Sequence, residues 1–91
     1  VFKPKLPHMG WNSIQVKNIP ELFKGVNQEY GFYFIHSYYI EVKNKEDIMT
    51  ITNYENDFVS GINRLNIYAV QFHPEKSHRN GIELLKNFSQ L

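Results

Sequence analysis

The sequence predicts one α/β domain, made of several short strands followed by a single amphipathic helix. Its 91 residues are enough for one hydrophobic core and too few for two. Hydrophobic residues make up 42% of the chain, with seven Phe and six Tyr, which is a globular rather than a disordered composition. Two apolar and aromatic runs, at residues 32–35 and 67–72, are typical of strands, and apolar residues at helical spacing follow them.

The first part of the chain is predicted to hold two short strands around a loop. Residues 1–3 are typical of the end of a strand, which Pro4 and Pro7 then break. We expect residues 6–12 to form an ordered loop. Apolar and polar residues alternate over 14–16, which suits a short strand.

A helical turn and the most apolar strand are predicted next. Residues 20–25 suit one or two helical turns, because a proline stands near their start and a glycine past their end. Residues 32–35 form a continuous apolar run that ends at His36 and Ser37. Such a run is typical of a strand that is covered on both faces.

The remaining strands are predicted from their turns. Residues 40–43 and 48–54 flank a charged segment, which indicates a hairpin. Residues 57–62 suit a further strand, and a turn at 63–66 leads into 67–72. That last run has the apolar, β-branched and aromatic content of a buried strand.

The chain is predicted to close in strand, loop and amphipathic helix. After residues 73–75 the spacing of the apolar residues becomes helical. Ile82, Leu85 and Phe88 fall on one stripe of this helix, and the stripe is widened by Leu84 and Leu91.

Charge, length and cysteine content exclude several classes of protein. The net charge is +1, from ten Lys and Arg against nine Asp and Glu, and no basic block indicates a nucleic-acid surface. The longest apolar-rich stretch, residues 31–40, is about half a bilayer span. No secretion signal opens the chain, so we expect a soluble cytosolic protein without membrane contact. Because the sequence has no cysteine, it cannot supply a disulfide, a Cys-ligated metal site or a cysteine nucleophile.

The segment at residues 71–77 carries the most informative chemistry. His73 and Glu75 stand two positions apart where a predicted strand ends, so their side chains point to the same side of an extended chain. Pro74 restricts the backbone on both sides of it. A carboxylate on one imidazole nitrogen fixes the tautomer and leaves the other nitrogen as a base for a nucleophile supplied from elsewhere.

Spacing alone leaves two other interpretations of this segment open. One is a loop histidine beside a solvated glutamate. The other is a metal site formed by His73, Glu75 and either His78 or His8, although no third ligand has a defined spacing.

Four segments in order resemble one enzyme family. Residues 72–75, Phe-His-Pro-Glu, are similar to the motif that closes the Cys-His-Glu triad of class I glutamine amidotransferases. Residues 7–12, 33–39 and 81–88 resemble further segments of one branch, the glutaminase subunits of imidazole glycerol phosphate synthase. The likeness spans nearly the whole chain.

The resemblance implies a fold and a reaction. Residues 1–91 would be the C-terminal part of a single amidotransferase domain, an α/β fold with a mixed central sheet and flanking helices. His73 would be the base that deprotonates a cysteine, and Glu75 would orient it. The thiolate would attack the side-chain amide of glutamine, ammonia would leave, and water would release glutamate from the thioester. No cofactor and no metal are implied.

The resemblance also implies a substrate site and a partner. His36, Ser37 and Tyr38 would lie beside the bound glutamine, whose two polar ends would meet backbone groups there. A cyclase-type synthase subunit, built as a barrel, would receive the ammonia. The residues facing this subunit would be Met9, Trp11, Tyr33 and Lys76. Without the resemblance, the same residue types also suit a core tryptophan, a structural histidine and a solvated lysine.

In one respect the sequence departs from the family. The nucleophilic cysteine and the oxyanion-hole glycines of the family lie on an upstream Gly-rich elbow, and this sequence has no cysteine. We therefore expect these 91 residues not to hydrolyse glutamine alone. We expect the chain to be a fragment of a complete subunit. A second chain that supplies the N-terminal half is one alternative, and a degenerate module is another.

Four functions follow from these observations. The first is a glutaminase subunit that channels ammonia for imidazole glycerol phosphate formation in histidine biosynthesis. The second is a paralogue that feeds the amidation of a surface sugar. The third is a non-catalytic module that docks a synthase, and the fourth is a metal-binding domain.

Overall fold

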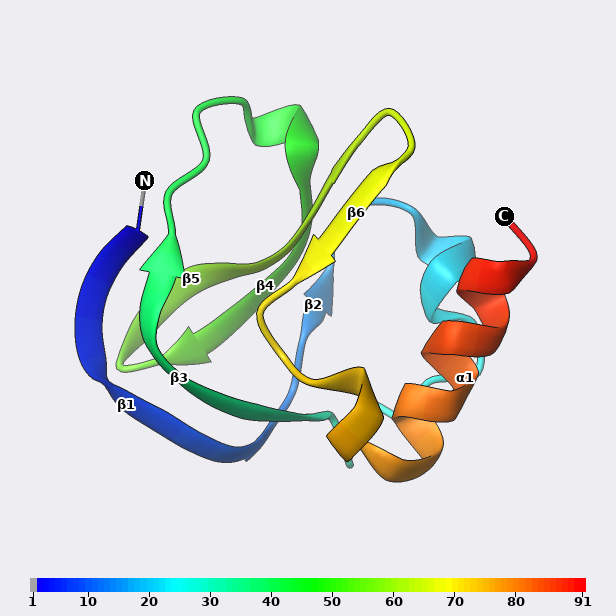
Figure 1. Ribbon diagram of the computed structural model, residues 1–91, viewed down its shortest axis with the longest axis horizontal. Coiled ribbons are helices and arrows are strands. Elements are labelled where there is room, and N and C mark those ends of the chain that lie inside the picture. The colour runs from blue at the N-terminus through cyan, green and yellow to red at the C-terminus, as the bar shows by residue number, and fades with distance from the viewer. Residues whose placement is uncertain (1) are drawn as a thin grey trace.

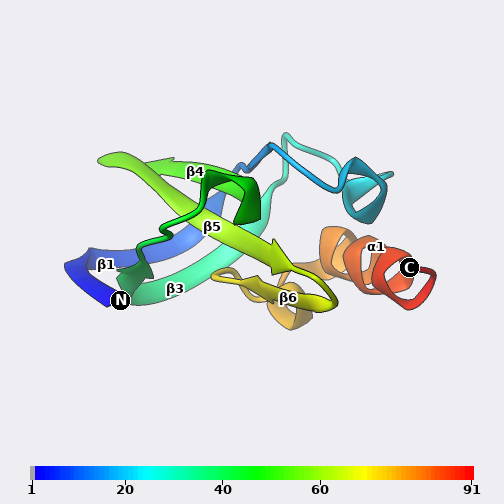
Figure 2. The same cartoon turned by 90° about the horizontal axis from the view of Figure 1, so that it is seen from above.

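The computed structural model describes the backbone of residues 2–91 and the side chains of residues 7–91 (Figure 1). Val1, expected near the end of a strand, lies outside the described residues. Along the chain the elements are β1 (Phe2–Asn12), β2 (Gln15–Val16), η1 (Pro20–Phe23), β3 (Phe32–Ile40), η2 (Lys45–Asp47), β4 (Ile48–Tyr54), β5 (Asn56–Arg64), β6 (Ile67–Val70), η3 (Pro74–Lys76) and α1 (His78–Ser89). The helix α1 and the 3-10 helix η1 pack together at one end of the sheet (Figure 2).

The strands of residues 2–91 form one six-stranded sheet. β1, β3, β5, β4 and β2 lie side by side in that order, and β6 pairs with β5. Every pairing among residues 2–91 is antiparallel, whereas the resemblance implied a mixed sheet for the complete domain. A parallel pair needs a crossover connection of about a dozen residues or more, whereas β4, β5 and β6 follow one another through tight turns. The sheet and α1 confirm the α/β class.

β1 replaces the loop that was predicted for residues 6–12. This strand lies at the edge of the sheet, beside β3. A proline cannot donate to the ladder of hydrogen bonds, so Pro4 and Pro7 are tolerated on an edge strand. The register of the pairing shifts between Pro4 and His8. The prolines therefore interrupt the ladder locally without ending the strand.

The predicted hairpin between residues 40–43 and 48–54 is wrong. β5 separates β3 from β4 in the sheet, and the charged connection between β3 and β4 contains η2. The tight hairpin joins β4 to β5 through Glu55, whose φ of 68° lies in the left-handed region. The short strand expected over 14–16, the helical turn expected over 20–25 and the strand expected over 57–62 are confirmed in β2, η1 and β5.

The hydrophobic core lies on one face of β3, where Phe32 and Phe34 are completely buried. The core cluster consists of Ile14, Leu22, Phe23, Phe32, Phe34, Met49, Phe58, Phe72 and Leu84. Successive side chains of a strand point to opposite faces, and Ile35 is 40% exposed on the other face. The expectation that both faces of this strand are covered is therefore wrong. β6 is also more exposed than expected, because Ile67 is 65% exposed.

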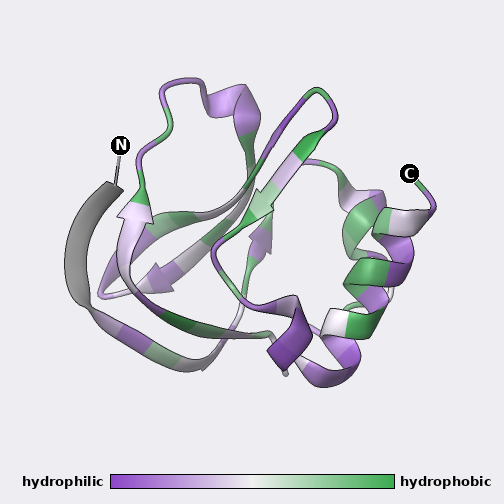
Figure 3. Ribbon diagram, viewed as in Figure 1, coloured by the Kyte–Doolittle hydropathy of each residue, from purple (hydrophilic) through white to green (hydrophobic). Residues whose placement is uncertain are grey.

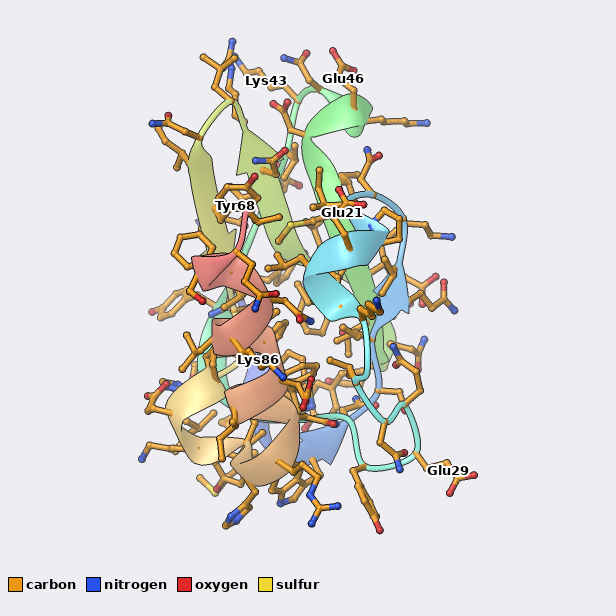
Figure 4. The ribbon with its side chains drawn as sticks, turned by 90° about the vertical axis from the view of Figure 1, so that its right-hand side faces the viewer. Glu21, Glu29, Lys43, Glu46, Tyr68 and Lys86 are labelled. Carbon is orange, nitrogen blue, oxygen red and sulfur yellow. The ribbon has the colours of Figure 1, made fainter. Side chains whose placement is uncertain are left out.

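α1 turns most of its predicted apolar stripe away from the core, and Leu84 is the member of the stripe that is buried. Its buried residues are Asn80, Gly81 and Leu84. The other apolar residues of the predicted stripe remain at least half exposed: Ile82, Leu85 and Phe88 in α1, and Leu91 beyond its end. Hydrophobic and hydrophilic residues alternate along this helix in Figure 3. Figure 4 shows Tyr68 of β6 near the C-terminal end of α1, where its ring centroid lies 5.5 Å from that of Phe88. Within residues 2–91 no helix is long and apolar enough to cross a membrane.

Candidate functional site

The two residues predicted to form a base and its orienter are in contact. Nδ1 of His73 lies 2.9 Å from Oε2 of Glu75. His73 has an extended backbone, with φ −107° and ψ 96°, directly before η3, and Pro74 is the first residue of that turn. The proline fixes its own φ and restricts the residue before it. The two side chains meet as expected, but they do so across the 3-10 turn η3 and not along an extended chain.

The turn that carries His73 is fastened to β3 through Tyr33. The N–H of His73 donates to the carbonyl of Tyr33 at 2.9 Å. The hydroxyl of Ser77 accepts the N–H of Tyr33 at 2.9 Å and donates to the carbonyl of His73 at 2.6 Å. Ser77 is 1% exposed, so these bonds lie away from water. Sequence reasoning missed Ser77, because a serine three residues after a proline carries no sign of burial.

Close packing of α1 holds the same turn from the other side. A Cβ atom at Gly81 would lie 1.8 Å from the carbonyl oxygen of Pro74. Only glycine lets the first turn of α1 approach η3 this closely. The position of the His73–Glu75 pair therefore depends on β3 and on α1.

The electrostatics of the pair favour an ionised Glu75. The hydrogen bond with His73, and after it one from the backbone N–H of Glu75, holds the pKa of the Glu75 carboxyl below its ordinary value of 4.5. The side chain of Glu75 is 64% exposed and that of His73 is 33% exposed. The contact is an ion pair only while His73 is protonated. With Nδ1 of His73 bound to a carboxylate, Nε2 is the nitrogen that can accept a proton.

The residues predicted to lie beside the substrate line one hollow, together with a residue that follows β6. His36, Ser37 and Tyr38 line a hollow of about 430 Å³ together with Gln71. These residues lie within β3, which continues to Ile40 and does not end at Ser37 as expected. Gln71 stands two positions before His73, and its N–H donates to the carbonyl of Ser60 at 2.8 Å.

A buried histidine, His8, contacts His36, which lines this hollow; the sequence had offered His8 only as a possible metal ligand. It is 4% exposed, and its Nδ1 lies 3.0 Å from Nε2 of His36. Nδ1 of His36 lies in turn 2.7 Å from the carbonyl oxygen of Tyr38. The strand pairing that sets His8 opposite His36 could have been found only by predicting β1 as a strand.

Three of the four residues expected to face a partner lie on one face of β1 and β3. Met9 is 67% exposed and Trp11 is 46% exposed, so the alternative of a core tryptophan is wrong. The rings of Trp11 and Tyr33 meet edge to face at 6.0 Å between centroids. Trp11 also stacks on His78 at 5.5 Å. Lys76 is exposed on η3, beside the turn that binds the backbone of Tyr33.

The described part of the chain contains no set of ligands for the metal site considered above. Among those residues, no group of three or more His, Cys, Asp or Glu side chains could hold a metal ion. Glu75 is already engaged by His73 at 2.9 Å. His8 is engaged by His36 at 3.0 Å.

Comparison with known proteins agrees with the sequence motifs. The family model "Glutamine amidotransferase class-I" matches residues 1–90. The chain is 47% identical to imidazole glycerol phosphate synthase subunit HisH of Leptospira borgpetersenii over 90 residues, which are 99% of this chain and 44% of that protein. It is 51% identical to subunit HisH 1 of Methanococcus maripaludis over 89 residues, 96% of this chain and 43% of that protein. The chain thus spans less than half the length of these relatives.

Proposed function

The chain belongs to the class-I glutamine amidotransferase family, and on this premise we propose that it forms the C-terminal part of a glutaminase subunit. This subunit releases ammonia from glutamine for a synthase that makes imidazole glycerol phosphate in histidine biosynthesis. The relatives reported above are named as subunits of imidazole glycerol phosphate synthase, which favours this product over amidation of a surface sugar.

In the proposed reaction His73 is the general base and Glu75 is its orienter. Glu75 accepts the Nδ1 proton at 2.9 Å, which leaves Nε2 to take the proton of a cysteine thiol. The thiolate attacks the amide carbon of glutamine, and His73 returns the proton to the departing ammonia. Water then hydrolyses the thioester. The sequence has no cysteine, so the nucleophile comes from outside these 91 residues.

Glutamine is proposed to bind along residues 36–38. The hollow of about 430 Å³ that these residues line with Gln71 supports this placement. It lies where the chain leads from β6 towards His73. Backbone groups of Ser37 and Tyr38 would meet the α-amino and carboxylate ends of the substrate.

The synthase subunit is proposed to cover the exposed face of β1 and β3. Met9 and Trp11 supply large exposed side chains there, and aromatic anchors dominate the energetics of interfaces. Tyr33 and Lys76 complete this surface beside the turn of His73. The partner would be the barrel-shaped cyclase subunit of a heterodimer, which receives the ammonia.

The observation that carries the proposal is the His73–Glu75 hydrogen bond of 2.9 Å in a chain whose family model extends over residues 1–90. To test it, this chain is joined to the part of the Leptospira borgpetersenii relative that it does not match, giving a complete glutaminase. Release of glutamate is measured with the synthase subunit present. We expect release, and a loss of about 10²–10⁴-fold in His73→Ala, because a general base contributes that much.

The matched variants are Glu75→Gln and Glu46→Gln. Glu75→Gln should lower kcat, since an amide in place of the carboxylate no longer fixes the tautomer. Glu46 lies on η2, at the opposite end of the molecule from η3, and its variant should keep full activity (Figure 4). Glutamate release that persists in His73→Ala, or is absent from the unsubstituted protein, would contradict the proposal.

A non-catalytic docking module is the second candidate. The exposure of Met9 and Trp11 favours it. It predicts that the 91-residue chain binds the synthase subunit with an affinity that His73→Ala leaves unchanged. Titration calorimetry measures this affinity, and the glutamate assay above distinguishes the two candidates.

A further inference from the structure

We propose that His8 is a positioning residue for the glutamine site and acts through His36 on the carbonyl group of Tyr38. The role towards glutamine rests on the proposed function, which sets residues 36–38 beside the substrate. The connection between the side chains rests on the hydrogen bonds of the described residues alone.

Hydrogen bonds link Asn12, His8, His36 and Tyr38 into one series, called here the histidine relay. Nδ2 of Asn12 lies 3.3 Å from Nε2 of His8. Nδ1 of His8 lies 3.0 Å from Nε2 of His36, and Nδ1 of His36 lies 2.7 Å from the carbonyl oxygen of Tyr38. The relay therefore runs from the edge strand β1 into β3 and ends at the backbone of the proposed glutamine site.

The direction of the relay is fixed at the Asn12 end. Oδ1 of Asn12 accepts the N–H of Ser13 at 2.8 Å, and Nδ2 donates to the carbonyl of Asn53 at 2.8 Å. These two bonds settle which atom of the amide is nitrogen. Nδ2 of Asn12 has a second hydrogen, and it donates this hydrogen to His8. Nε2 of His8 is the acceptor, so the proton of His8 is on Nδ1.

The Tyr38 end requires the same direction independently. A carbonyl oxygen only accepts hydrogen bonds, so Nδ1 of His36 carries the proton that it donates to Tyr38. Nε2 of His36 then carries no proton and accepts the Nδ1 proton of His8. Both ends agree on one arrangement, in which each ring is neutral and carries its proton on Nδ1. A second proton on His36 would place its Nε2–H against the Nδ1–H of His8. A second proton on His8 would place its Nε2–H against the amide group of Asn12.

Packing holds the first ring of the relay in place. His8 is stacked between Phe34, at 4.6 Å between ring centroids, and Tyr54, at 4.1 Å. The planes are inclined by only 17° and 10°. A ring confined on both faces keeps its Nδ1 directed at His36, and hydrogen bonds of this kind fix the tautomer and orientation of the next ring.

The backbone at Tyr38 needs such support because strand pairing is interrupted there. The register between β1 and β3 shifts between the pairs Pro4↔Tyr38 and His8↔His36. Pro4 has no N–H and cannot donate to the carbonyl of Tyr38. The imidazole of His36 supplies a donor to this carbonyl from within β3. The relay thus sets the path of residues 36–38, against which glutamine is proposed to lie.

The kinetic test uses the complete glutaminase described above. His8→Phe keeps an aromatic ring between Phe34 and Tyr54 and removes the donor to His36. We expect about a tenfold higher KM for glutamine and a kcat within about twofold, since tenfold is the effect of one lost hydrogen bond. His8→Gln, whose amide can donate to His36, should recover part of the KM.

The matched control is Tyr54→Phe. It removes the hydroxyl that donates to the carbonyl of Pro7 at 2.6 Å and keeps the ring that stacks on His8. Its KM should stay within about twofold of the unsubstituted protein, because the relay is intact. A KM in His8→Phe that is no higher than in Tyr54→Phe overturns the proposal.

An independent readout is the tautomer of each ring, measured by ¹⁵N NMR of the complete glutaminase labelled at histidine. The resonances are assigned by their loss in His8→Phe and His36→Gln. Protons on Nδ1 in both rings support the relay, and a proton on Nε2 of either ring overturns it. If the unsubstituted protein releases no glutamate, the proposed function and the role towards glutamine both fail. If it is active and His8→Phe keeps the normal KM, this inference alone fails.

Discussion

The hydroxyl group of Ser77 donates a 2.6 Å hydrogen bond to the carbonyl group of His73. The same hydroxyl accepts the N–H of Tyr33 at 2.9 Å. One buried side chain therefore joins the turn of the proposed base to the strand β3. The carbonyl of Tyr33 completes this link by accepting the N–H of His73 at 2.9 Å.

Replacing Ser77 with alanine should destabilise the protein and displace His73. Ser77→Ala removes the acceptor of the Tyr33 N–H in a site that is 1% exposed, while the carbonyl of His73 keeps the N–H of Lys76 at 3.0 Å. We expect a cost of about 1–3 kcal/mol in the free energy of unfolding, measured by urea denaturation. Ser89→Ala is the control, because Ser89 is exposed near the end of α1. Equal stabilities of the two variants would show that the Ser77 bonds contribute nothing.

A methyl group at Gly81 should separate α1 from η3. In Gly81→Ala the new Cβ would lie 1.8 Å from the carbonyl oxygen of Pro74. The resulting strain should exceed the roughly 1 kcal/mol that alanine gains over glycine within a helix, so the net effect is destabilising. Lys86→Ala, on the exposed side of α1, should change the stability by less than about 0.5 kcal/mol. A Gly81→Ala protein as stable as Lys86→Ala would refute the close contact.

The sequence was most informative where local rules decide the structure. Pro74 restricts its own backbone and that of His73, and the contact between His73 and Glu75 was predicted from this restriction. The extended chain assumed over these residues is instead the 3-10 turn η3. The edge strand β1 was missed, because Pro4 and Pro7 break a strand only where both of its edges must be paired. Whether the prolines end the strand depends on the order of strands in the sheet, and no local sequence pattern specifies that order.

Burial was the least predictable property. The apolar content of residues 67–72 indicated a buried strand, yet Ile67 is 65% exposed. Helical spacing identified the apolar stripe of α1 but not the face that meets the core. The buried face instead carries Asn80, which bonds to the loop before β3, and Gly81, which permits close contact. The histidine relay was hidden for the same reason, because it depends on a strand pairing.

Stability should depend on pH through Glu75. Its pKa is lower in the folded protein than its ordinary value of 4.5, chiefly through the hydrogen bond with His73. A carboxyl group of this kind contributes stability above pH 4.5, and that contribution is lost as the pH falls through the folded-state pKa. A ¹³C NMR titration of the Glu75 carboxyl should show a midpoint below 4.5. In His73→Ala the midpoint should move upward. A midpoint that does not respond to His73→Ala would assign the lowered pKa to another cause.

Two neighbouring leucines of α1 should differ strongly in their effect on stability. Leu84 is 5% exposed in the core cluster, whereas Leu85 is 53% exposed. Leu84→Ala should cost about 2–5 kcal/mol, since it removes buried methyl groups and leaves a cavity. Leu85→Ala should cost less than about 1 kcal/mol in the same denaturation experiment, because alanine has the better helix propensity. The opposite ranking would mean that the side of α1 with Leu85, and not the side with Leu84, packs on the core.

Asn80 should be the most sensitive polar residue outside the proposed catalytic pair. It is 1% exposed, and its side chain bonds to both backbone groups of Asn27 and to the carbonyl of Gly31. These bonds of 2.6–2.8 Å hold the loop that leads into β3. Asn80→Ala leaves one buried donor and two acceptors with lost partners, so we expect a cost of about 2–4 kcal/mol in the free energy of unfolding.

The variant Asn80→Asp tests whether the donors of the amide are responsible. At neutral pH a carboxylate would set its oxygens against the carbonyls of Asn27 and Gly31, which now lie 2.7 Å and 2.6 Å from Nδ2. Burial and these carbonyls would raise the pKa of the new carboxyl group. Because a raised pKa favours the folded state at low pH, the deficit of Asn80→Asp should shrink as the pH falls and the group gains a donor. Gln15→Ala, at an exposed position of β2, should leave the stability unchanged. A deficit of Asn80→Asp that stays constant with pH would show that shape, and not donation to the two carbonyls, makes Asn80 necessary.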